Sequence, residues 1–299
     1  MRDRFVKNLI NYIKKNKDTF FITGDLGFGV IDELSKKFPK NIINAGVSEQ
    51  NMIGVASGLA SRGSKVVVYS IGNFSTLRCL EQIRNDICYH NLDVKIVSVG
   101  AGFSYGVLGV SHHATEDIGI FNTLPNIDIF SPATLRELDI TCKEIFKSKK
   151  PSFIRLDKSK SNFKGRLANG FNYQKQNNSK ICIFSTGGIL EEVVYLIEKN
   201  KNFKAISVCS LYKLKPLNNK KLLEFIKQFK EIISLEEHQL NGGLGSILTS
   251  LIYDNNLKVK LHKLAVKNSY SNVAGDQKYL RKINKIDSVS IKDKLLEIM

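Results

Sequence analysis

The sequence lacks the features that would place the protein in a membrane or in an oxidising compartment. Its five cysteines form no CxxC pair, and two of them, Cys182 and Cys209, lie within hydrophobic runs typical of buried strands. This pattern predicts buried, reduced thiols and no disulfide framework. No hydrophobic run approaches the ~20 residues that span a bilayer, and the N-terminal MRDRFVKNLI has no signal-peptide core. We therefore expect a cytoplasmic protein that does not bind membranes.

Positive charge is abundant, but it is not concentrated. The formal net charge is +17, yet the lysines are spread over predicted helix faces and loops. The sequence has no arginine-rich block and no basic patch interleaved with aromatic residues. Because nucleic-acid binding depends on a concentrated patch of positive charge, we expect no nucleic-acid partner. An acidic partner protein or anionic substrates would suit the charge.

Several widespread catalytic motifs are also missing. The sequence contains no GxSxG nucleophile elbow, no P-loop and no HExxH zinc motif. The segment EEH at 236–238 combines two carboxylates with an imidazole. A solvated strand end explains this segment at least as well as a catalytic role does.

Short hydrophobic runs of strand length alternate with helical patterns along most of the chain. Such runs occur at 19–23, 65–70, 94–100, 127–131 and 152–157 in the first half. The alternation predicts an α/β fold with mostly parallel sheets that helices cover on both faces.

A polar segment divides the chain of 299 residues, which is long enough for two domains. KSKSNFKGRLANGFNYQKQNNSK, which begins at Lys158, has little hydrophobic periodicity, and the strand–helix alternation resumes after it. We predict a first domain over 1–157, a linker over 158–179 and a second, smaller α/β domain over 180–299.

Chemically useful side chains follow three of the predicted strands. In open α/β sheets, functional residues gather in loops beyond the carboxyl ends of the strands. The candidates are Glu49 in the first loop, Phe74 and Arg78 in the second, and His112 and His113 in a glycine-rich third loop. The strand order predicts that all three loops open on the same edge of one sheet.

Each candidate also has a purely structural explanation. An acid at the start of a helix, such as Glu49, is more often a cap than a catalyst, because it meets unpaired N–H groups. An isolated phenylalanine such as Phe74 packs in the core by default. The adjacent His112 and His113 should point in different directions, which makes them a poor pair of metal ligands. No metal site is predicted from this chain.

Five segments taken together resemble the C-terminal half of transketolase. They are GDLGFG, GVSEQNMIGVASGLA, YSIGNFSTLRCLEQIRND, GFSYGVLGVSHHATEDIGIF and SPATLRELD. More specifically, the chain is similar to the small subunit of a split transketolase. The first predicted domain resembles the pyrimidine-binding domain of that family, and the remainder resembles its C-terminal domain.

The resemblance implies thiamine diphosphate as the cofactor and gives each candidate a role. Glu49 matches the family glutamate that hydrogen-bonds N1′ of the aminopyrimidine ring and thereby activates the coenzyme. Phe74 would stack on that ring, and Arg78 would line the same side of the cofactor site. His112 matches a histidine that contacts the donor sugar, and His113 takes the place of a substrate-site residue that is often glutamine.

The sequence departs from the family at three substrate positions. Gly100 stands where typical transketolases have another histidine, and Leu108 stands where an aspartate often contacts a donor hydroxyl. Lys158 lies near an arginine that holds the sugar phosphate, and a lysine offers a point charge without the planar fork of arginine. These differences leave the donor sugar, the acceptor sugar and the pathway open.

The family holds the diphosphate and Mg²⁺ with a GDG-to-Asn motif, and this sequence contains no GDG. The resemblance therefore implies that the chain carries half an active site and shares thiamine diphosphate with a large subunit that supplies the Mg²⁺ ligands. The expected assembly is at least a heterotetramer built on a dimer of small subunits, with sugar phosphates as substrates.

The leading hypothesis is a subunit of an enzyme that transfers two-carbon ketol units between sugar phosphates. The same fold leaves open the β-subunit of a 2-oxoacid dehydrogenase and a synthase that condenses pyruvate with a sugar aldehyde. A further alternative is a binding or regulatory protein without catalysis, which the presence of Glu49 and His112 disfavours.

Overall fold

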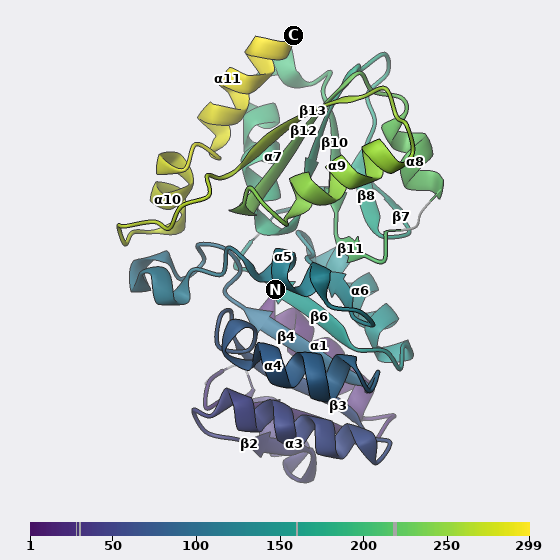
Figure 1. Cartoon of the computed structure of the whole chain (residues 1–299), viewed down its shortest axis with the longest axis vertical. Helices are drawn as coiled ribbons and strands as arrows, with labels where there is room; N and C mark the ends of the chain where they lie inside the picture. The colour runs from purple at the N-terminus through teal and green to yellow at the C-terminus, as the bar shows by residue number, and fades with distance from the viewer. Residues whose placement is uncertain (28, 30, 160, 218–219) are drawn as a thin grey trace.

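The computed structural model describes residues 1–27, 29, 31–159, 161–217 and 220–299. Phe28, in the GDLGFG segment, and Lys160, in the predicted linker, lie outside the described residues. The chain forms two α/β domains stacked along its long axis, each with a central sheet between helices (Figure 1). The predicted fold class is confirmed.

The first domain is built on a seven-stranded sheet. The strand order is β11 (Lys213–Lys215), β5 (Asp128–Phe130), β6 (Ser152–Leu156), β4 (Val94–Val99), β3 (Lys65–Ile71), β1 (Thr19–Thr23) and β2 (Ile42–Asn44). The pairings are parallel apart from that of β11 with β5, which is antiparallel. The central strands β3 and β4 are buried along almost their whole length, which explains their continuous hydrophobic runs.

Helices cover both faces of this sheet. α1 (Arg2–Ile13), α2 (Asp32–Lys37) and α6 (Leu135–Lys147) pack on one face, and α3 (Glu49–Ser61), α4 (Leu80–Gln82) and α5 (Asp117–Thr123) pack on the other. The apolar side of α1 is buried, as its amphipathic sequence predicts. Single turns lie at Pro39–Asn41, Leu77–Cys79, Gly106–Leu108, Val110–His112, Gly187–Ile189 and Lys201–Phe203 (3₁₀) and at Ile83–Cys88 (π).

The second domain is built on a six-stranded sheet. Its order is β13 (Lys260–Val266), β12 (Glu231–Gln239), β9 (Ile181–Ser185), β10 (Ser207–Leu211), β8 (Phe171–Gln174) and β7 (Arg166–Ala168). The first four strands are parallel, and β8 and β7 extend the sheet in antiparallel fashion. One face packs against α7 (Leu190–Lys199), α10 (Gln277–Ile283) and α11 (Ser288–Ile298), and the other packs against α8 (Lys220–Ile226) and α9 (Leu244–Asp254).

The domain boundary differs from the prediction. β7 and β8 lie inside 158–179, so the structure contradicts a linker over that whole range. These strands are short. β8 pairs with β10 and β7 pairs with β8, and the buried Asn172 of β8 places Nδ2 2.8 Å from Glu137 Oε1. Strand β11 also returns from the second part of the chain to the first sheet. The two sheets are therefore joined by more than a linker.

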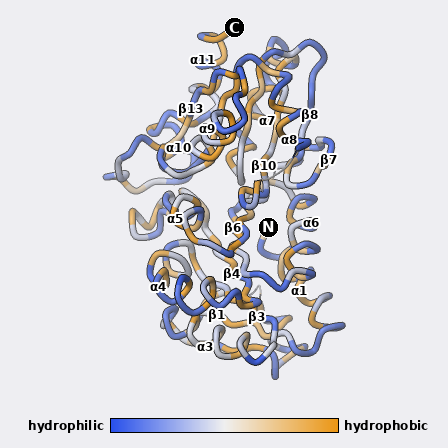
Figure 2. The backbone as a smooth tube through the Cα atoms, turned by 45° about the vertical axis from the view of Figure 1, so that its right-hand side comes forward, coloured by the Kyte–Doolittle hydropathy of each residue, from blue (hydrophilic) through white to orange (hydrophobic). Residues whose placement is uncertain are grey.

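Hydrophobic residues concentrate along the strands and the inward helix faces of both domains (Figure 2). All five cysteines are buried and unpaired, which confirms the prediction of free thiols. Among the described helices, none combines the length and the hydropathy needed to cross a bilayer.

The second sheet docks on the first domain through the carboxyl end of β12. Glu236, Glu237 and His238 are all buried there, so the interpretation of EEH as a solvated strand end is wrong. His238 Nε2 accepts a 3.1 Å hydrogen bond from the N–H of Gly119, which lies in α5 of the first domain. Arg155, at the end of β6, donates from Nη2 to the backbone oxygen of Glu237 at 3.0 Å.

Asp157 belongs to the same interface and should make stability depend on pH. An added Cβ on Gly188 of the second domain would lie 1.7 Å from Asp157 Oδ2, so the carboxyl group packs directly against that glycine. Burial raises the pKa of Asp157 to about 6 from the ordinary value of 3.8. Between about pH 4 and pH 6 the folded chain keeps a proton that the unfolded chain has lost, so stability falls as pH rises through this range.

We expect Asp157→Asn to stabilise the protein at pH 7.5 relative to wild type, by on the order of 2 kcal/mol, and to have a clearly smaller effect at pH 4.5. Denaturant unfolding at both pH values measures this difference. Asp139→Asn is the control with opposite sign, because the hydrogen bond from Arg4 lowers the pKa of Asp139 and its charge stabilises the folded state above that pKa. An equal effect of Asp157→Asn at both pH values would contradict the assignment.

Candidate functional site

The candidate loops meet at the carboxyl edge of the first sheet. Strands β2, β3, β4 and β6 run in the same direction, so the loops that follow them open on one edge. The prediction that the three loops share an edge is confirmed. The structure also brings side chains from these loops into direct contact.

Glu49 is the first residue of α3, and its side chain is only 1% exposed. Its Oε2 accepts a 2.7 Å hydrogen bond from Arg78 Nη1, and its Oε1 lies 3.4 Å from Ser70 Oγ of β3. Within the described residues, its carboxylate makes no bond to the N–H groups of α3, so its contacts do not support the capping interpretation. Among the described contacts, Oε1 has this long one alone, so it can accept a stronger hydrogen bond from a ligand.

Arg78 connects Glu49 with the aromatic part of the site. Its guanidinium carbon lies 4.3 Å from the centre of the Phe74 ring, a cation–π distance. The His112 ring packs edge-on against Phe74, with 5.1 Å between ring centres and 70° between the ring planes. Glu49, Arg78, Phe74 and His112 thus form one continuous line of side chains from three loops, which we call the Glu49–His112 row.

His112 is a neutral hydrogen-bonding group at the end of this row. Burial, and to a smaller extent the neighbouring His113, lower the pKa of His112 below its usual range. Its Nδ1 lies 3.0 Å from Ser111 Oγ. A neutral imidazole can both donate and accept hydrogen bonds, which suits a ligand rich in hydroxyl groups.

His113 points into the loop interior. It is 3% exposed, its Nε2 lies 3.2 Å from the backbone oxygen of Gly106, and its ring packs edge-on against Phe103. The two histidines diverge, as the sequence predicts. The described contacts of His113 hold it against its own loop, and its predicted contact with substrate stays a prediction.

Lys158 follows β6 and lies against the loop that carries His112. Its Nζ donates a 3.0 Å hydrogen bond to the backbone oxygen of Ser104 and lies 4.3 Å from the centre of the Tyr105 ring. Among the described contacts of Lys158, none joins it to the Glu49–His112 row.

Two further residues shape the site and were missed by the sequence reasoning. Asn73 donates from Nδ2 to the backbone oxygens of His113 at 2.8 Å and Ser111 at 3.2 Å, which fixes the third loop against the second. An added Cβ on Gly72 would lie 2.8 Å from Ala114 Cβ, so the two loops approach closely there. The sequence feature that could have identified them is the segment IGNFS, in which a glycine and an asparagine directly precede Phe74.

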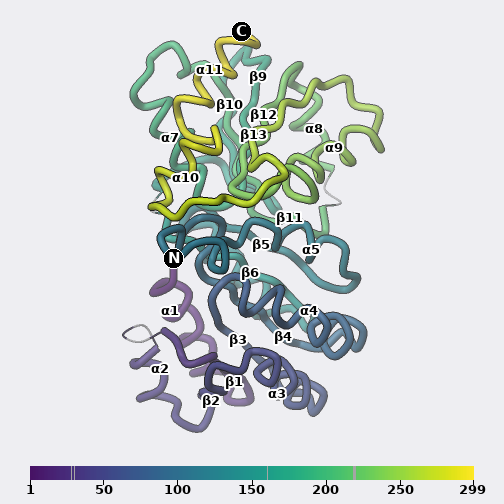
Figure 3. The backbone as a smooth tube through the Cα atoms, turned by 60° about the vertical axis from the view of Figure 1, so that its left-hand side comes forward, coloured from purple at the N-terminus to yellow at the C-terminus, as the bar shows by residue number. Residues whose placement is uncertain are grey.

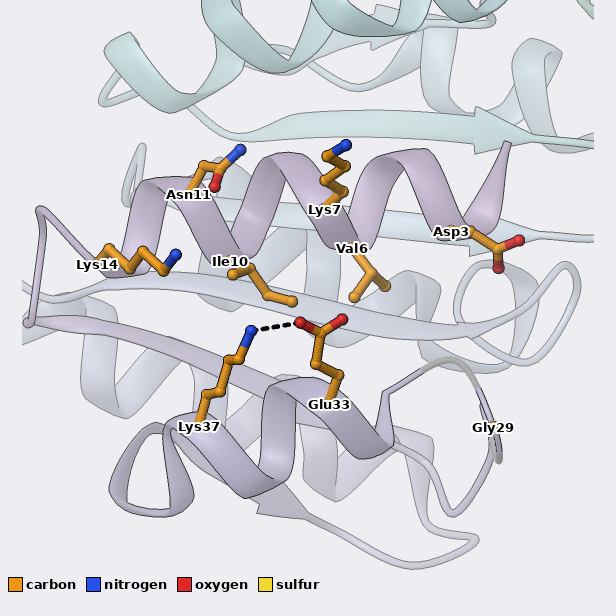
Figure 4. A pocket seen from close by; sticks show the side chains of 9 residues that line it. All are labelled: Asp3, Val6, Lys7, Ile10, Asn11, Lys14, Gly29, Glu33 and Lys37. Atoms are coloured by element: carbon orange, nitrogen blue, oxygen red, sulfur yellow. Dashed lines mark hydrogen bonds and ion pairs between the residues drawn. The ribbon is translucent and has the colours of Figure 1, made fainter.

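A separate groove lies away from these residues. It has a volume of about 510 Å³ and runs between α1 and α2, where Lys37 pairs with Glu33 (Figure 4). None of the sequence-predicted site residues lines it.

Two family models match nearly the whole chain. The transketolase pyrimidine-binding domain matches residues 1–164, and the transketolase C-terminal domain matches residues 171–286. The chain belongs to the transketolase family. β7 lies between the two matched regions, inside the range that the sequence predicts as a linker.

Relatives within the transketolase family include separate subunits as well as longer chains. An apulose-4-phosphate transketolase subunit of Actinobacillus succinogenes is 30% identical over 98% of this chain and 96% of its own. 1-deoxy-D-xylulose-5-phosphate synthase of Clostridium tetani is 27% identical over 89% of this chain but only 44% of its own. A split-gene transketolase, solved as an inactive β4 tetramer, has a TM-score of 0.84 and 25% identity over 97% of this chain and 95% of its own.

The residues at the sheet edge fit the cofactor of the transketolase family, thiamine diphosphate. Glu49 offers a buried carboxylate oxygen whose described partner is distant, and Phe74 offers an aromatic ring in the same row. Gly24, in the GDLGFG segment, lies beside this oxygen, since an added Cβ would be at a contact distance of 3.4 Å from Glu49 Oε1. The two family models thus confirm the family that the sequence motifs indicate.

Proposed function

We propose that this chain is the small subunit of a transketolase that transfers two-carbon ketol units between sugar phosphates. The observation that carries the proposal is the buried carboxylate of Glu49, which shares a row with Arg78, Phe74 and His112 at the carboxyl edge of the first sheet. Thiamine diphosphate, when bound, would supply the nucleophilic carbon.

Glu49 is the residue that would hold and activate the cofactor ring. Its Oε1 would accept a hydrogen bond from the aminopyrimidine, and its burial strengthens that bond relative to one in water. Arg78 holds Oε2 and so orients the carboxylate. Phe74 would pack against the ring, while His112 would hydrogen-bond the hydroxyl groups of the donor sugar.

Lys158 would contribute a positive charge for the sugar phosphate. It lies on the loop after β6, at the same sheet edge as the row, where its ammonium group contacts Ser104. A lysine at this position attracts a phosphate by charge but does not impose the two-point geometry of an arginine.

The proposal includes a large subunit that carries the diphosphate and Mg²⁺ ligands. Exposed apolar side chains occur on the same three loops as the row, as expected for a surface that a partner covers; they are Val47, Leu77, Val107, Leu108 and Val110. The relative from A. succinogenes is itself named as a transketolase subunit. We propose at least a heterotetramer built on a dimer of small subunits.

A competing function is a synthase that condenses pyruvate with a sugar aldehyde, favoured by the similarity to 1-deoxy-D-xylulose-5-phosphate synthase. The two reactions differ in their balance, because a synthase releases CO₂ from pyruvate and a transketolase releases an aldose from a ketose donor. We expect the enzyme reconstituted with its large subunit to transfer ketol units from ketose phosphates without releasing CO₂ from pyruvate. CO₂ release with pyruvate as the donor would replace the transketolase proposal by the synthase.

The two histidines should behave differently in the reconstituted enzyme. We expect His112→Ala to lower kcat/KM for the donor by one to two orders of magnitude, with little change in cofactor affinity, because His112 lies at the far end of the row from Glu49. His113→Ala should mainly lower the melting temperature, since it removes a buried ring that packs on Phe103. Steady-state kinetics and thermal unfolding of both variants measure the contrast. The reverse pattern would mean that His113 faces the substrate.

A further inference from the structure

The loop that carries His112 is closed at its base by a short backbone bridge. Gly102 and Ala114 exchange hydrogen bonds of 3.0 Å and 2.9 Å, so residues 103–113 form a closed excursion from the first domain. Gly102 has a φ of +56°, a backbone conformation that residues other than glycine rarely adopt. The position of His112 therefore depends on what holds this base.

Glu237 of the second domain holds the base of the loop. This residue lies near the end of β12, is 4% exposed, and accepts a hydrogen bond from the backbone N–H of Phe103 through Oε1. An added Cβ on Gly102 would lie 2.5 Å from the same oxygen. The carboxylate of Glu237 thus occupies the space that a side chain at position 102 would fill.

Arg281 of α10 fixes the carboxylate of Glu237 in turn. Its Nε donates a 2.6 Å hydrogen bond to Glu237 Oε2, and its Nη1 lies 2.6 Å from Glu191 and 3.1 Å from Glu192 of α7. Gln277 donates from Nε2 to Glu237 Oε1 at 2.9 Å. The carboxylate is therefore held by partners on both oxygens.

Helix α10 also contacts the loop directly. The N–H of Gly275, just before this helix, lies 3.3 Å from the backbone oxygen of Gly106, and an added Cβ on Gly106 would lie 2.4 Å from Leu280 Cδ1. Gln277 Nε2 lies 3.4 Å from Ser104 Oγ. Figures 1 and 3 show α10 and the segment before it at the boundary between the domains, beside this loop.

We propose that Glu237, held by Arg281, is a positioning residue through which the second domain sets the His112 loop against Phe74. Glu237 makes no described contact with the Glu49–His112 row, so it acts on the site through the backbone of Phe103. The structural part of this proposal, that Glu237 holds the loop, depends only on contacts within this chain. Its kinetic consequence rests on the transketolase function proposed above.

Glu237→Gln is the informative substitution because it keeps the size of the side chain. The carboxylate accepts bonds from Phe103 on one oxygen and from Arg281 on the other, whereas an amide can accept on one side only. One of the two contacts must fail and leave a buried donor without its partner. Glu231→Gln is the matched control, because Glu231 lies at the other end of β12 and its carboxylate bonds His262, away from the loop.

Hydrogen exchange of the full chain tests the structural part. In E237Q, peptides that cover 101–114 should exchange at least about tenfold faster than in wild type, with no such change in E231Q. Unchanged exchange of this segment in E237Q would overturn the proposal, whatever the enzyme does. If E237Q does not fold, Arg281→Lys keeps the positive charge but removes the guanidinium that holds Glu237 Oε2, and unchanged exchange of the segment in that variant would equally overturn the proposal.

Kinetics of the reconstituted enzyme test the positioning role. E237Q should raise KM for the donor by about fivefold or more while cofactor affinity and the KM for the acceptor stay within about twofold of wild type. Faster exchange with an unchanged donor KM would show that Glu237 is merely structural and would overturn the positioning role. Absence of ketol transfer by the wild-type enzyme would instead count against the proposed function, and the exchange result would still decide the structural part.

Discussion

Replacing Glu49 by glutamine should lower kcat of the reconstituted enzyme by at least about a hundredfold and leave the chain folded. The side chain is almost fully buried, and glutamine has nearly the same shape, so the packing around α3 should survive. The change removes the negative charge that would stabilise a protonated ring nitrogen of the cofactor. It also puts an amide N–H where a carboxylate oxygen would accept a bond, or else breaks the contact with Arg78.

The control for this substitution is Glu116→Gln. Glu116 is also an acid at the start of a helix on the same sheet edge, but its carboxylate bonds only its neighbour Thr115 among the described contacts. Turnover of E116Q should stay within about threefold of wild type, because no cofactor-facing charge is lost. Thermal unfolding of both variants checks that they are folded. Near-normal turnover of E49Q would remove Glu49 from the mechanism.

The sequence was sufficient to predict the main parallel strands of the first sheet and the shared edge of the loops that follow them. Long hydrophobic runs such as KVVVYS and VKIVSV report strands buried on both faces, and parallel strands bring their following loops to one edge. The contact between Glu49 and Arg78 was beyond local reasoning, because the two residues are 29 positions apart and lie on loops whose exact approach depends on Gly72 and Asn73.

The errors share a physical cause, which is that distant partners stabilise the segments concerned. β7 and β8 are short strands in a polar segment; β8 is held by pairing with β10 and β7 by pairing with β8, so the sequence suggested a linker. The carboxylates of EEH looked solvated because their neutralising groups lie far along the chain. Glu237 meets Arg281 of α10, and Glu236 accepts bonds from the N–H groups of Leu244 and Gly245 at the start of α9.

The chain purified alone should bind thiamine diphosphate weakly or not at all and should show no ketol transfer. It offers the carboxylate of Glu49 and the ring of Phe74 for the aminopyrimidine, but its sequence contains no GDG motif for Mg²⁺ and the diphosphate. The diphosphate carries most of the charge of the cofactor, and Mg²⁺ is usually held by carboxylates together with such phosphates, so losing these contacts removes a large part of the anchoring. The related split-gene transketolase in the form of a β4 tetramer is likewise described as inactive.

Adding a large subunit that carries the GDG motif should restore both binding and activity. Its surface would cover the exposed apolar side chains on the loops that carry the row, and light scattering of the mixture should give a mass of at least two copies of each chain. Calorimetry with thiamine diphosphate and Mg²⁺ compares the isolated chain with the mixture. The E49Q chain, mixed in the same way, should still assemble, because Glu49 is buried beneath the surface that the partner would contact. Micromolar, Mg²⁺-dependent binding to the isolated wild-type chain would reveal a diphosphate site within these 299 residues and would overturn the shared-site proposal.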